Sequence, residues 1–550
     1  MKRLIQLSIY TLLIAIIGVG CSIDRKPESL FSDVDFWNTE TDLVYATNKL
    51  YQQLDANWLD NRADDGINQN ANSVSNGTRQ IPNTSADWND RYDEIFTANN
   101  ILEKAVKAQV SDAIKNRYLG EARFFRAYAY LNLLQKYGDV PLLVKTLDFN
   151  SPELTMPRTP RAEVIAQIYE DLDFAAQWLP ARSALPASQW GRVTKSAAYA
   201  LKARAALYEG TRAKFHNTGE WQQHLQTAVT AAEAAMTQGN DLYPSYFGLF
   251  QPGADGAANK EAILVKIFGV NNTNVLLGHN YSRDLENGRY AITRNLIRQF
   301  LYTDGRPAWT TTNTPLSNPS SFYVPEANES SYNTIFENRD PRLATIVFKA
   351  GDTAYKGAWV PTTTLGSRTG YASKKGFNIP DWTINGAGTT DKMLIRYAEV
   401  LLIFAEAKYE LTESISDADL DKSINRLRTR AGLNVKLTNA FVTANGLNMR
   451  EEIRRERTVE LALEGFRYDD LIRWKTAEIL LPQNLLGAKY VAADWPGTAV
   501  GNLNLNSDAV IIAEPASART FRPDRDYLYP VPINEITLSG GNVQQNPNWQ

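Results

Sequence analysis

The sequence predicts a mainly α-helical fold with a long irregular middle. Apolar residues recur at the three- and four-residue spacing of amphipathic helices from about Thr41 to Gly239, and again over residues 391–480. Between them, residues 241–390 are rich in Gly, Asn, Ser, Thr and Pro, and the helical periodicity fades to short fragments. Helices on both sides of an irregular middle indicate one interleaved domain, with the middle displayed on a helical base.

The first region, placed at residues 40–240, is predicted to be helical throughout. Either Thr39 or Thr41 can cap its first helix, and loops that contain residues such as Gly138 and Pro160 separate the later ones. The predicted helices cover residues 42–54, 91–106, 113–138, 161–179, 194–210 and 221–236. Paired helices rich in Ala, Tyr and Leu at this spacing resemble tetratricopeptide-type repeats, although their lengths are not regular.

The second region, 241–550, is predicted to combine the irregular stretch 241–390 with helices within 391–480. These helices cover residues 393–411, 419–433 and 449–480, and a second irregular stretch runs from Pro482 to the end. A long stretch without regular elements inside a folded chain is usually functional, because its backbone must find water, side chains or a ligand. We therefore expect 241–390 to form a ligand face that packs as one domain with 40–240.

The only cysteine of the 550 residues, Cys21, follows the one long apolar run of the chain. Lys2 and Arg3 precede this run, and small residues precede the cysteine, as in an export signal. The run is too short to span a membrane comfortably as a permanent helix. A lone cysteine in an exported chain leaves an intermolecular bond, a free thiol or covalent modification.

This N-terminal segment resembles the lipobox of bacterial lipoproteins, in which the cysteine becomes the acylated N-terminus. Gly18 departs from the pattern, since leucine is common three residues before the cysteine. We expect a signal peptide at 1–20, lipidation of Cys21 and a tether at 21–39. An ordinary secretory signal with an incidental cysteine is the alternative.

Composition and motifs argue against several classes of function. The chain carries 58 Lys and Arg against 61 Asp and Glu, with no basic block, so nucleic acid is not an expected partner. The three histidines, His216, His224 and His279, lack metal-type spacing. The sequence contains neither a Gly-x-Ser-x-Gly motif nor a phosphate-binding Gly-Lys-Thr loop. We therefore predict no catalytic residue, no bound metal and no cofactor.

Segments distributed through the mature chain resemble the SusD/RagB family of outer-membrane nutrient-binding lipoproteins. They are FWNTETDLVYATNKLYQQL, EARFFRAYAYLNLLQKYGDVPL, NRDPRL, IRYAEVLLIFAEA, INRLRTRAGL, IRRERTVELALEGFRYDDLIRW and DYLYPVPINEITLSGGNVQQNPNW. The resemblance implies a SusD-like fold, in which tetratricopeptide-like helix pairs support a loop-rich, irregular binding face. It also implies a partner, a SusC-like TonB-dependent transporter of the outer membrane, over which the lipoprotein sits as a lid.

Several carboxylates in these segments admit two interpretations. Glu460 and Glu464 could be the acid and base of a glycosidase, whose two carboxylates flank the scissile bond. They lie one helical turn apart on one face, which is a poor geometry for that role, and arginines at helical spacing can pair with them. We favour a structural role for them, and also for Arg396, Glu399 and Glu406.

A sugar ring offers apolar faces to aromatic planes and hydroxyl groups to polar side chains. Two regions contain that mixture, and the family commonly uses the loop after the first helix, where Asp64 and Asp65 resemble an acidic pair. The candidate ligand residues are Trp58, Asp60, Arg62, Asp64, Asp65 and Trp88 in the first region, and Tyr281, Arg283, Tyr290, Trp309, Trp359, Arg368, Tyr371 and Trp382 in the second. Aromatic residues usually fill cores, so packing is the alternative for each ring. The acidic run at 59–68 faintly resembles a calcium loop, but Arg62 occupies a position that would need an oxygen ligand, which argues against calcium there.

These observations favour a lipid-anchored protein of the outer membrane, facing the cell exterior, that binds oligosaccharide and passes it to the transporter. Some members of the family bind peptides, so a peptide-binding member is the first alternative. A lipid-anchored glycoside hydrolase and a helical scaffold that binds no nutrient are the others.

Overall fold

The structure is a computed structural model that describes residues 36–54, 60–271, 274–275, 277–363 and 367–549. The predicted export signal, Cys21 and Trp58 lie outside these ranges. Within the described ranges, no helix is long and apolar enough to cross a membrane.

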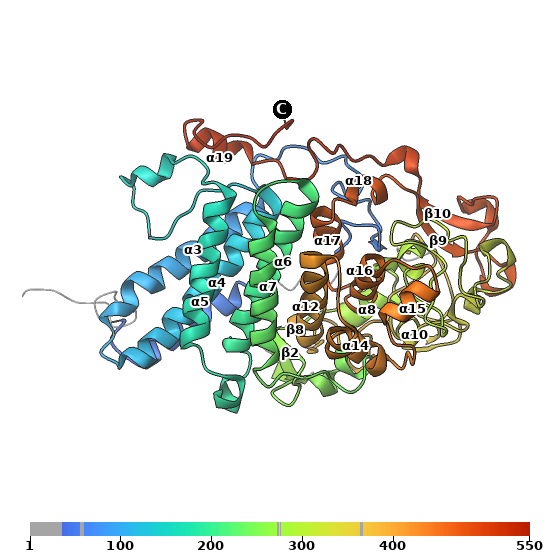
Figure 1. Cartoon of the computed structure of the whole chain (residues 1–550), viewed down its shortest axis with the longest axis horizontal. Coiled ribbons are helices and arrows are strands. Elements are labelled where there is room, and N and C mark those ends of the chain that lie inside the picture. The colour runs from blue at the N-terminus through green and yellow to red at the C-terminus, as the bar shows by residue number, and fades with distance from the viewer. Residues whose placement is uncertain (1–35, 55–59, 272–273, 276, 364–366, 550) are drawn as a thin grey trace, which may run out of the picture.

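Six helices form the N-terminal helical layer (Figure 1). They are α2 (Glu40–Gln52), α3 (Ala86–Lys104), α4 (Asp112–Tyr137), α5 (Arg161–Trp178), α6 (Lys195–His216) and α7 (Trp221–Met236). From α3 onward each helix packs against the next, and α7 packs against α12 (Tyr397–Thr412). Each helix predicted for this region is therefore present, and the largest shift is at α6, which continues from Gly210 to His216.

Local signals explain where these helices begin and how closely they pack. The Asp42 backbone N–H donates to the Thr39 hydroxyl while the Asp42 carboxylate accepts the Thr39 N–H, which completes a capping box at the start of α2. Gly210 allows α6 to approach α7, because a Cβ at this position would lie 2.9 Å from the Leu225 side chain. The order and spacing of the layer thus follow from caps and small residues in the sequence.

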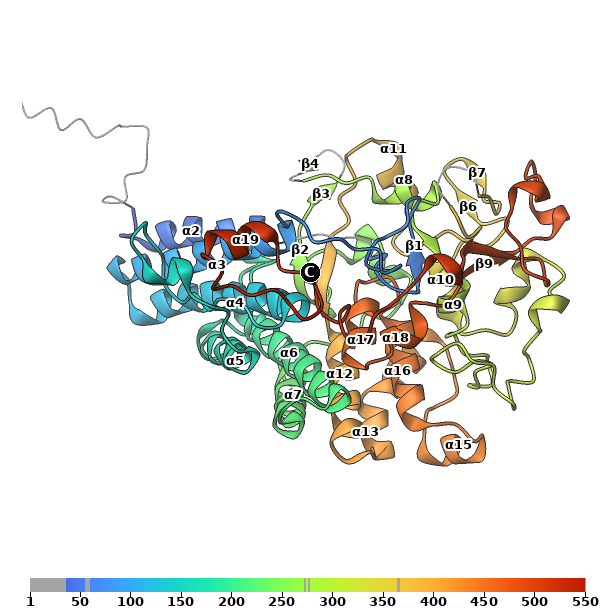
Figure 2. The same ribbon diagram turned by 90° about the horizontal axis from the view of Figure 1, so that it is seen from above.

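Outside the helical layer, the described strands pair two by two in antiparallel fashion. The pairs are β1 (Gly66–Ile67) with β5 (Ala291–Ile292), β2 (Ala262–Lys266) with β8 (Lys392–Arg396), β3 (Gly269–Asn271) with β4 (Asn274–Val275), β6 (Thr353–Ala354) with β7 (Gly357–Ala358), and β9 (Leu485–Lys489) with β10 (Val510–Glu514). The short helices of the middle are α8 (Tyr281–Glu286), α9 (Arg294–Ile297), α10 (Pro341–Ile346) and α11 (Ile379–Thr383). Seen from above, α8, α11 and the pairs β3–β4 and β6–β7 lie along one edge of the molecule (Figure 2).

The C-terminal helices are shorter than the periodicity predicted. Besides α12 they are α13 (Asp417–Lys422), α14 (Ile424–Ala431), α15 (Asn439–Ala444), α16 (Met449–Glu460), α17 (Arg467–Arg473), α18 (Ala477–Leu480) and α19 (Ile533–Leu538). A single helix over 449–480 is wrong, because Leu463 and Gly465 have φ values of 63° and 88°, which a right-handed helix cannot accommodate. The prediction for 393–411 is wrong at its start, since the residues before Tyr397 pair with β2 as strand β8.

Two large apolar clusters make up most of the core. The larger one joins the helical layer to α12 and includes Leu131, Leu201 and Leu402. The smaller one lies in the irregular half and includes Phe300 and many aromatic rings. Helix α16 and the turn after it contribute to both, so residues 449–463 connect the helical layer to the loops.

Candidate functional site

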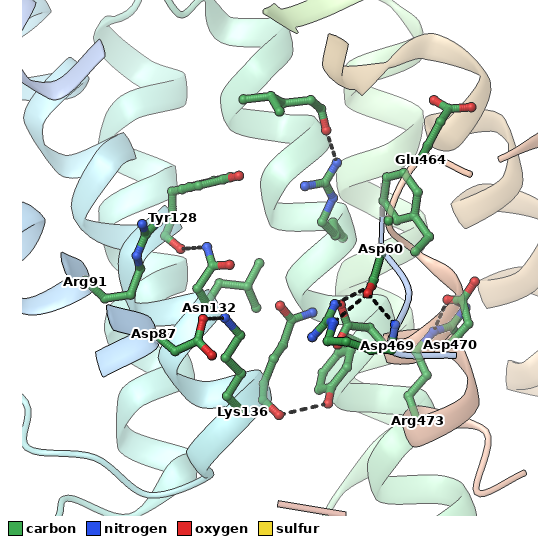
Figure 3. Close-up of a pocket in the computed structure, with 18 of the residues that line it drawn as sticks. Asp60, Asp87, Arg91, Tyr128, Asn132, Lys136, Glu464, Asp469, Asp470 and Arg473 are labelled. Atoms are coloured by element: carbon green, nitrogen blue, oxygen red, sulfur yellow. Dashed lines mark hydrogen bonds and ion pairs between the residues drawn. The ribbon is translucent and has the colours of Figure 1, made fainter. Parts of the chain in front are cut away.

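A charged cavity of about 340 Å³ lies between the helical layer and α17 (Figure 3). On one side Lys136 pairs with Asp87, and on the other the Arg62 guanidinium lies 2.6 Å from an Asp60 oxygen and 3.6 Å from one of Asp469. The predicted ligand residues Asp60 and Arg62 therefore pair with each other. A ligand that binds Lys136 or Arg62 in this cavity would have to compete with the carboxylates that already pair with them.

The acidic pair predicted to contact ligand is buried. Arg467 Nε donates to an Asp64 carboxylate oxygen at 2.7 Å, and Thr293 donates its backbone N–H to the Asp65 carbonyl at 3.2 Å. The Asp65 side chain is 5% exposed, and its Oδ1 has no hydrogen-bond partner within the described residues. Burial, reinforced by the neighbouring Asp64 charge, raises the pKa of Asp65 to about 8. In this structure the pair anchors a loop to the core and faces no solvent.

The carboxylates that a glycosidase would need are held in a buried ionic network. Glu460 accepts hydrogen bonds from Arg342, Arg396 and Arg430, and Glu464 accepts from Arg396 and Lys375. Burial opposes ionisation, but the guanidinium groups prevail and hold the pKa of Glu460 well below its usual range, and they lower the pKa of Glu464 to about 2. A general acid requires the opposite shift. The structural interpretation of both residues is confirmed.

The carboxylates of α12 are paired in the same way. Arg204 Nε donates to Glu399 at 2.6 Å, and Arg473 Nη2 donates to Glu406 at 2.8 Å. Burial opposes the ionisation of Glu406, yet the Arg473 charge lowers the pKa of Glu406 to about 2. These groups fix how α12 meets α6 and α17, and the structural interpretation is confirmed for them also.

An exposed aromatic stack stands on the irregular face. The ring centroids of Tyr355 and Trp382 lie 3.7 Å apart, with their planes inclined by 16°. Tyr355 is 44% exposed, whereas Trp382 is half-buried. Arg283 Cζ lies 4.5 Å and Lys356 Nζ 5.9 Å from the centroid of the Trp382 ring. We call Tyr355, Trp382, Arg283 and Lys356 the aromatic platform.

Helix α8 holds both sides of this platform. Arg283 Nε donates to the Trp382 carbonyl at 2.7 Å, which ties α8 to α11. The Glu286 carboxylate accepts the Lys356 backbone N–H at 2.8 Å, which ties α8 to the β6–β7 turn. The turn itself requires Gly357, whose φ is 121°. The rings therefore meet because one short helix, α8, binds two loops that follow it in the sequence by about 100 and 70 residues.

Four of the predicted ligand residues gather around α8. Arg283 and Trp382 belong to the platform, while Tyr281 is 7% exposed and lies beneath the surface. The half-buried Tyr290 ring has its centroid 6.3 Å from that of Tyr281. The structure thus brings together residues that are up to 101 positions apart in the chain, from 281 to 382.

Five others are buried or engaged elsewhere. Trp88, Trp359 and Tyr371 are at most 6% exposed, so the expected stacking on a sugar is not available to these rings in this structure, and packing is their role. A guanidinium covers the Trp309 ring, with its carbon 3.7 Å from the centroid. Arg368 donates to a backbone carbonyl of β10 at 2.6 Å.

Sequence reasoning missed Tyr355 and Lys356. The only local signal is the segment TAYKGA, in which Gly357 marks a tight turn that exposes the residues before it. Nothing in that segment indicates that its tyrosine meets a tryptophan of α11.

Two family models match the chain. One, described as the SusD family, matches residues 269–549, and one described as "Starch-binding associating with outer membrane" matches residues 28–207. "SusD-like protein P2" of Formosa agariphila is 26% identical over 571 residues, which cover 96% of this chain and 97% of the relative. A SusD-like protein of Bacteroides ovatus is 25% identical over 541 residues, which cover 93% of this chain and 88% of that one.

Solved structures match over nearly the whole chain. A SusD-like carbohydrate binding protein from Bacteroides fragilis superposes with a TM-score of 0.74 at 25% identity, covering 92% of this chain and 99% of that one. A second SusD-like protein from the same species gives a TM-score of 0.72 at 27% identity, covering 94% and 98%. A laminarin binding SusD-like protein, at 22% identity and a TM-score of 0.60, covers 93% of this chain and 100% of that one and shares the fold.

Proposed function

Because this chain belongs to the SusD family, we propose that it is a surface lipoprotein that binds oligosaccharide noncovalently and delivers it to a SusC-like TonB-dependent transporter. The observation that carries the proposal is the aromatic platform. It combines an exposed ring with hydrogen-bond donors at its rim, which is the arrangement that a sugar face and its hydroxyl groups require. A relative described as carbohydrate binding supports the same ligand class.

Binding without chemistry is supported by the state of the carboxylates. Glu460, Glu464 and Glu406 are ionised, buried and paired with arginines, so none of these three is available to protonate a leaving group. In this proposal the protein holds the saccharide and the transporter moves it.

Anchoring and delivery rest on the N-terminal sequence and on the family. Lipidation of Cys21 would keep the protein at the outer membrane. Several acyl chains on one residue anchor a protein stably, whereas a single acyl chain binds the membrane only marginally. The family model described as associating with the outer membrane supports that location. Exposure to the cell exterior and a transporter partner complete the proposal.

The experiment is calorimetry of the soluble protein from residue 22 onward with a panel of oligosaccharides and peptides, beside a reducing-sugar assay. Tyr355→Ala removes the exposed ring and should weaken saccharide binding by about 1 kcal/mol, or about fivefold, because stacking on one ring is worth about that much. Its unfolding free energy should fall by about 0.5–1.5 kcal/mol, because the variant also loses the stack on Trp382.

The matched control is Tyr45→Ala, which removes a tyrosine of α2 that is 58% exposed and should leave binding unchanged. Equal affinity of the Tyr355→Ala and wild-type proteins would remove the platform from the proposal. Peptide binding alone, or release of reducing sugar, would favour the alternative functions.

A further inference from the structure

We propose that the saccharide bound at the aromatic platform is anionic, carrying sulfate or carboxylate groups that Arg283 and Lys356 recognise. This inference rests on the proposed function and names the class of its ligand. The observation that carries it is the charge around the rings, because the Arg283 and Lys356 cations beside Trp382 have no carboxylate partner among the described residues.

Arg283 makes its hydrogen bonds to neutral groups. Its Nε and Nη2 donate to the carbonyls of Trp382 and Thr383 at 2.7 and 3.2 Å, and its Nη1 makes only a 3.5 Å contact with the Asn385 side chain. Within the described residues, the guanidinium forms no ion pair. Its position is therefore set by backbone carbonyls of α11, and its charge is left for another group.

Lys356 is in the same situation on the other side of the ring. Its Nζ donates to the Asn287 side chain, and in the part of the chain that the structure describes it has no ion pair. The side chain is exposed at the β6–β7 turn. Two cations thus lie 4.5 and 5.9 Å from the centroid of one indole ring, and neither forms an ion pair with a carboxylate of the described residues.

Two other cations of these loops are paired with carboxylates. Arg289 pairs with Asp284 at 2.9 Å, and Lys374 pairs with Asp352. The Glu286 carboxylate is 9% exposed and accepts the Lys356 backbone N–H. Asp284 and Asp352 therefore serve other cations, while Glu286 and Asp381 are buried, so the charged side chains that the platform presents at its rim are Arg283 and Lys356.

The chemistry of the rim favours an anion over a neutral hydroxyl group. Hydrogen bonds from a guanidinium or an ammonium group to an ionised oxygen are roughly twice as strong as those between neutral groups. A ring of the saccharide stacked on Tyr355 would place its substituents beside these two cations. Sulfate and carboxylate groups share this recognition, so matched ligands are needed to distinguish them.

The experiment measures affinities of the soluble protein for pairs of oligosaccharides that differ only in charge. The probes are oligogalacturonate before and after methyl esterification of its carboxylates, and a sulfated galactan oligosaccharide before and after chemical desulfation. We expect the charged member of at least one pair to bind more tightly by about fivefold or more. That preference should shrink as ionic strength rises from about 0.01 M to about 0.15 M, because the Debye length falls from about 30 Å to about 8 Å.

Lys356→Gln keeps a donor for Asn287 but removes the charge, so it should lower the affinity for the charged member by more than that for the neutral member and abolish most of the preference. Lys356→Arg should retain the preference. The matched control, Lys107→Gln, neutralises an exposed lysine after α3 and should behave as wild type.

The outcomes separate the two proposals. Equal binding of charged and neutral members, lost in Tyr355→Ala but unaffected by Lys356→Gln, would overturn the anionic ligand and leave the proposed function standing. Absence of binding to every saccharide tested would overturn both. A preference that survives Lys356→Gln unchanged would also overturn the role assigned here to this lysine.

Discussion

The N-terminal helical layer and the irregular half of the molecule are held together in different ways. In the layer, each helix satisfies its own backbone, and small apolar residues such as Ala203 and Ala206 are fully buried between neighbours. In the irregular half, several arginine side chains also donate at 2.8–2.9 Å to backbone carbonyls far away in the sequence: Arg294 to Gly487, Arg339 to Phe300, Arg455 to Trp309 and Arg519 to Leu481. One bond of this kind, from Arg161 to Leu134 at 2.8 Å, also joins two helices of the layer.

The difference follows from the backbone. Nearly every buried carbonyl needs a partner, and loops cannot supply one from the next turn as a helix does. A guanidinium group carries five donors in a fixed fork, so one arginine can satisfy carbonyls and a carboxylate at the same time, as Arg396 does with Glu460. Loops fixed in this way can hold exposed rings in place, which is what the aromatic platform requires.

The largest effect should come from breaking the ionic network. Arg396→Ala removes a side chain that is 2% exposed and leaves Glu460 and Glu464 with less compensation, so it should lower the free energy of unfolding by about 3–5 kcal/mol. Urea unfolding followed by circular dichroism measures this loss. Arg289→Ala, at an exposed pair with Asp284, should cost less than about 1 kcal/mol. Similar losses in both variants would show that the buried network contributes no more to stability than an exposed ion pair does.

A smaller effect tests the buried acid of the loop that follows α2. The folded-state pKa of Asp65, about 8, lies above its ordinary value of 3.8. The stability that the protonated carboxyl group contributes to the fold is therefore fully present below about pH 4 and is lost as pH rises through 8. Asp65→Asn cannot ionise and should therefore be more stable than wild type above pH 8, by about 2 kcal/mol.

Unfolding free energies at pH 4 and pH 9 measure the Asp65 effect, and the advantage of the variant should vanish at pH 4. Asp64→Asn is the matched control, because it breaks the pair with Arg467 and should be destabilising at pH 9. A variant Asp65→Asn that is less stable than wild type at pH 9 would show that the carboxylate is needed in its charged form.

The smallest effect tests packing in the helical layer. Alanine in place of Gly210 would gain up to about 1 kcal/mol of helix propensity, but its Cβ would meet Leu225 at 2.9 Å, and overpacking costs about 1–3 kcal/mol. We expect a net loss of about 1 kcal/mol in thermal or urea unfolding. Gly253→Ala, where no atom of the described residues lies within 4 Å of the added Cβ, should be close to neutral. A stabilised Gly210→Ala protein would mean that α6 and α7 can separate without cost.

Much of the architecture could be predicted from the sequence. The mainly α, SusD-like fold is confirmed, and the helix predicted at 221–236 has the bounds of α7. Errors occurred where tertiary contacts overrode a local pattern: β8 forms because β2 pairs with it, and the helix predicted over 449–480 breaks at Leu463 and Gly465. Helical periodicity cannot reveal either event, since both residue patterns are compatible with a continuous helix.

The candidate site was less predictable. Arg283 and Trp382 could be proposed because aromatic and planar polar residues are frequent in this region, but the same criterion also selected Trp359 and Tyr371, which are buried. Composition identifies which residues are able to stack on a ligand. It does not identify which of them the fold leaves exposed.

The sequence by itself determined the helices of the N-terminal layer and the family, because apolar periodicity, caps and motifs act over a few neighbouring residues. The anchor at Cys21 stays a prediction from the same kind of local motif. Only the tertiary structure decided which rings reach the surface and which charges form no ion pair within the described part of the chain. Tyr355 and Trp382 stack because α8 binds two distant loops, and pairings over such separations depend on the packing of the whole chain.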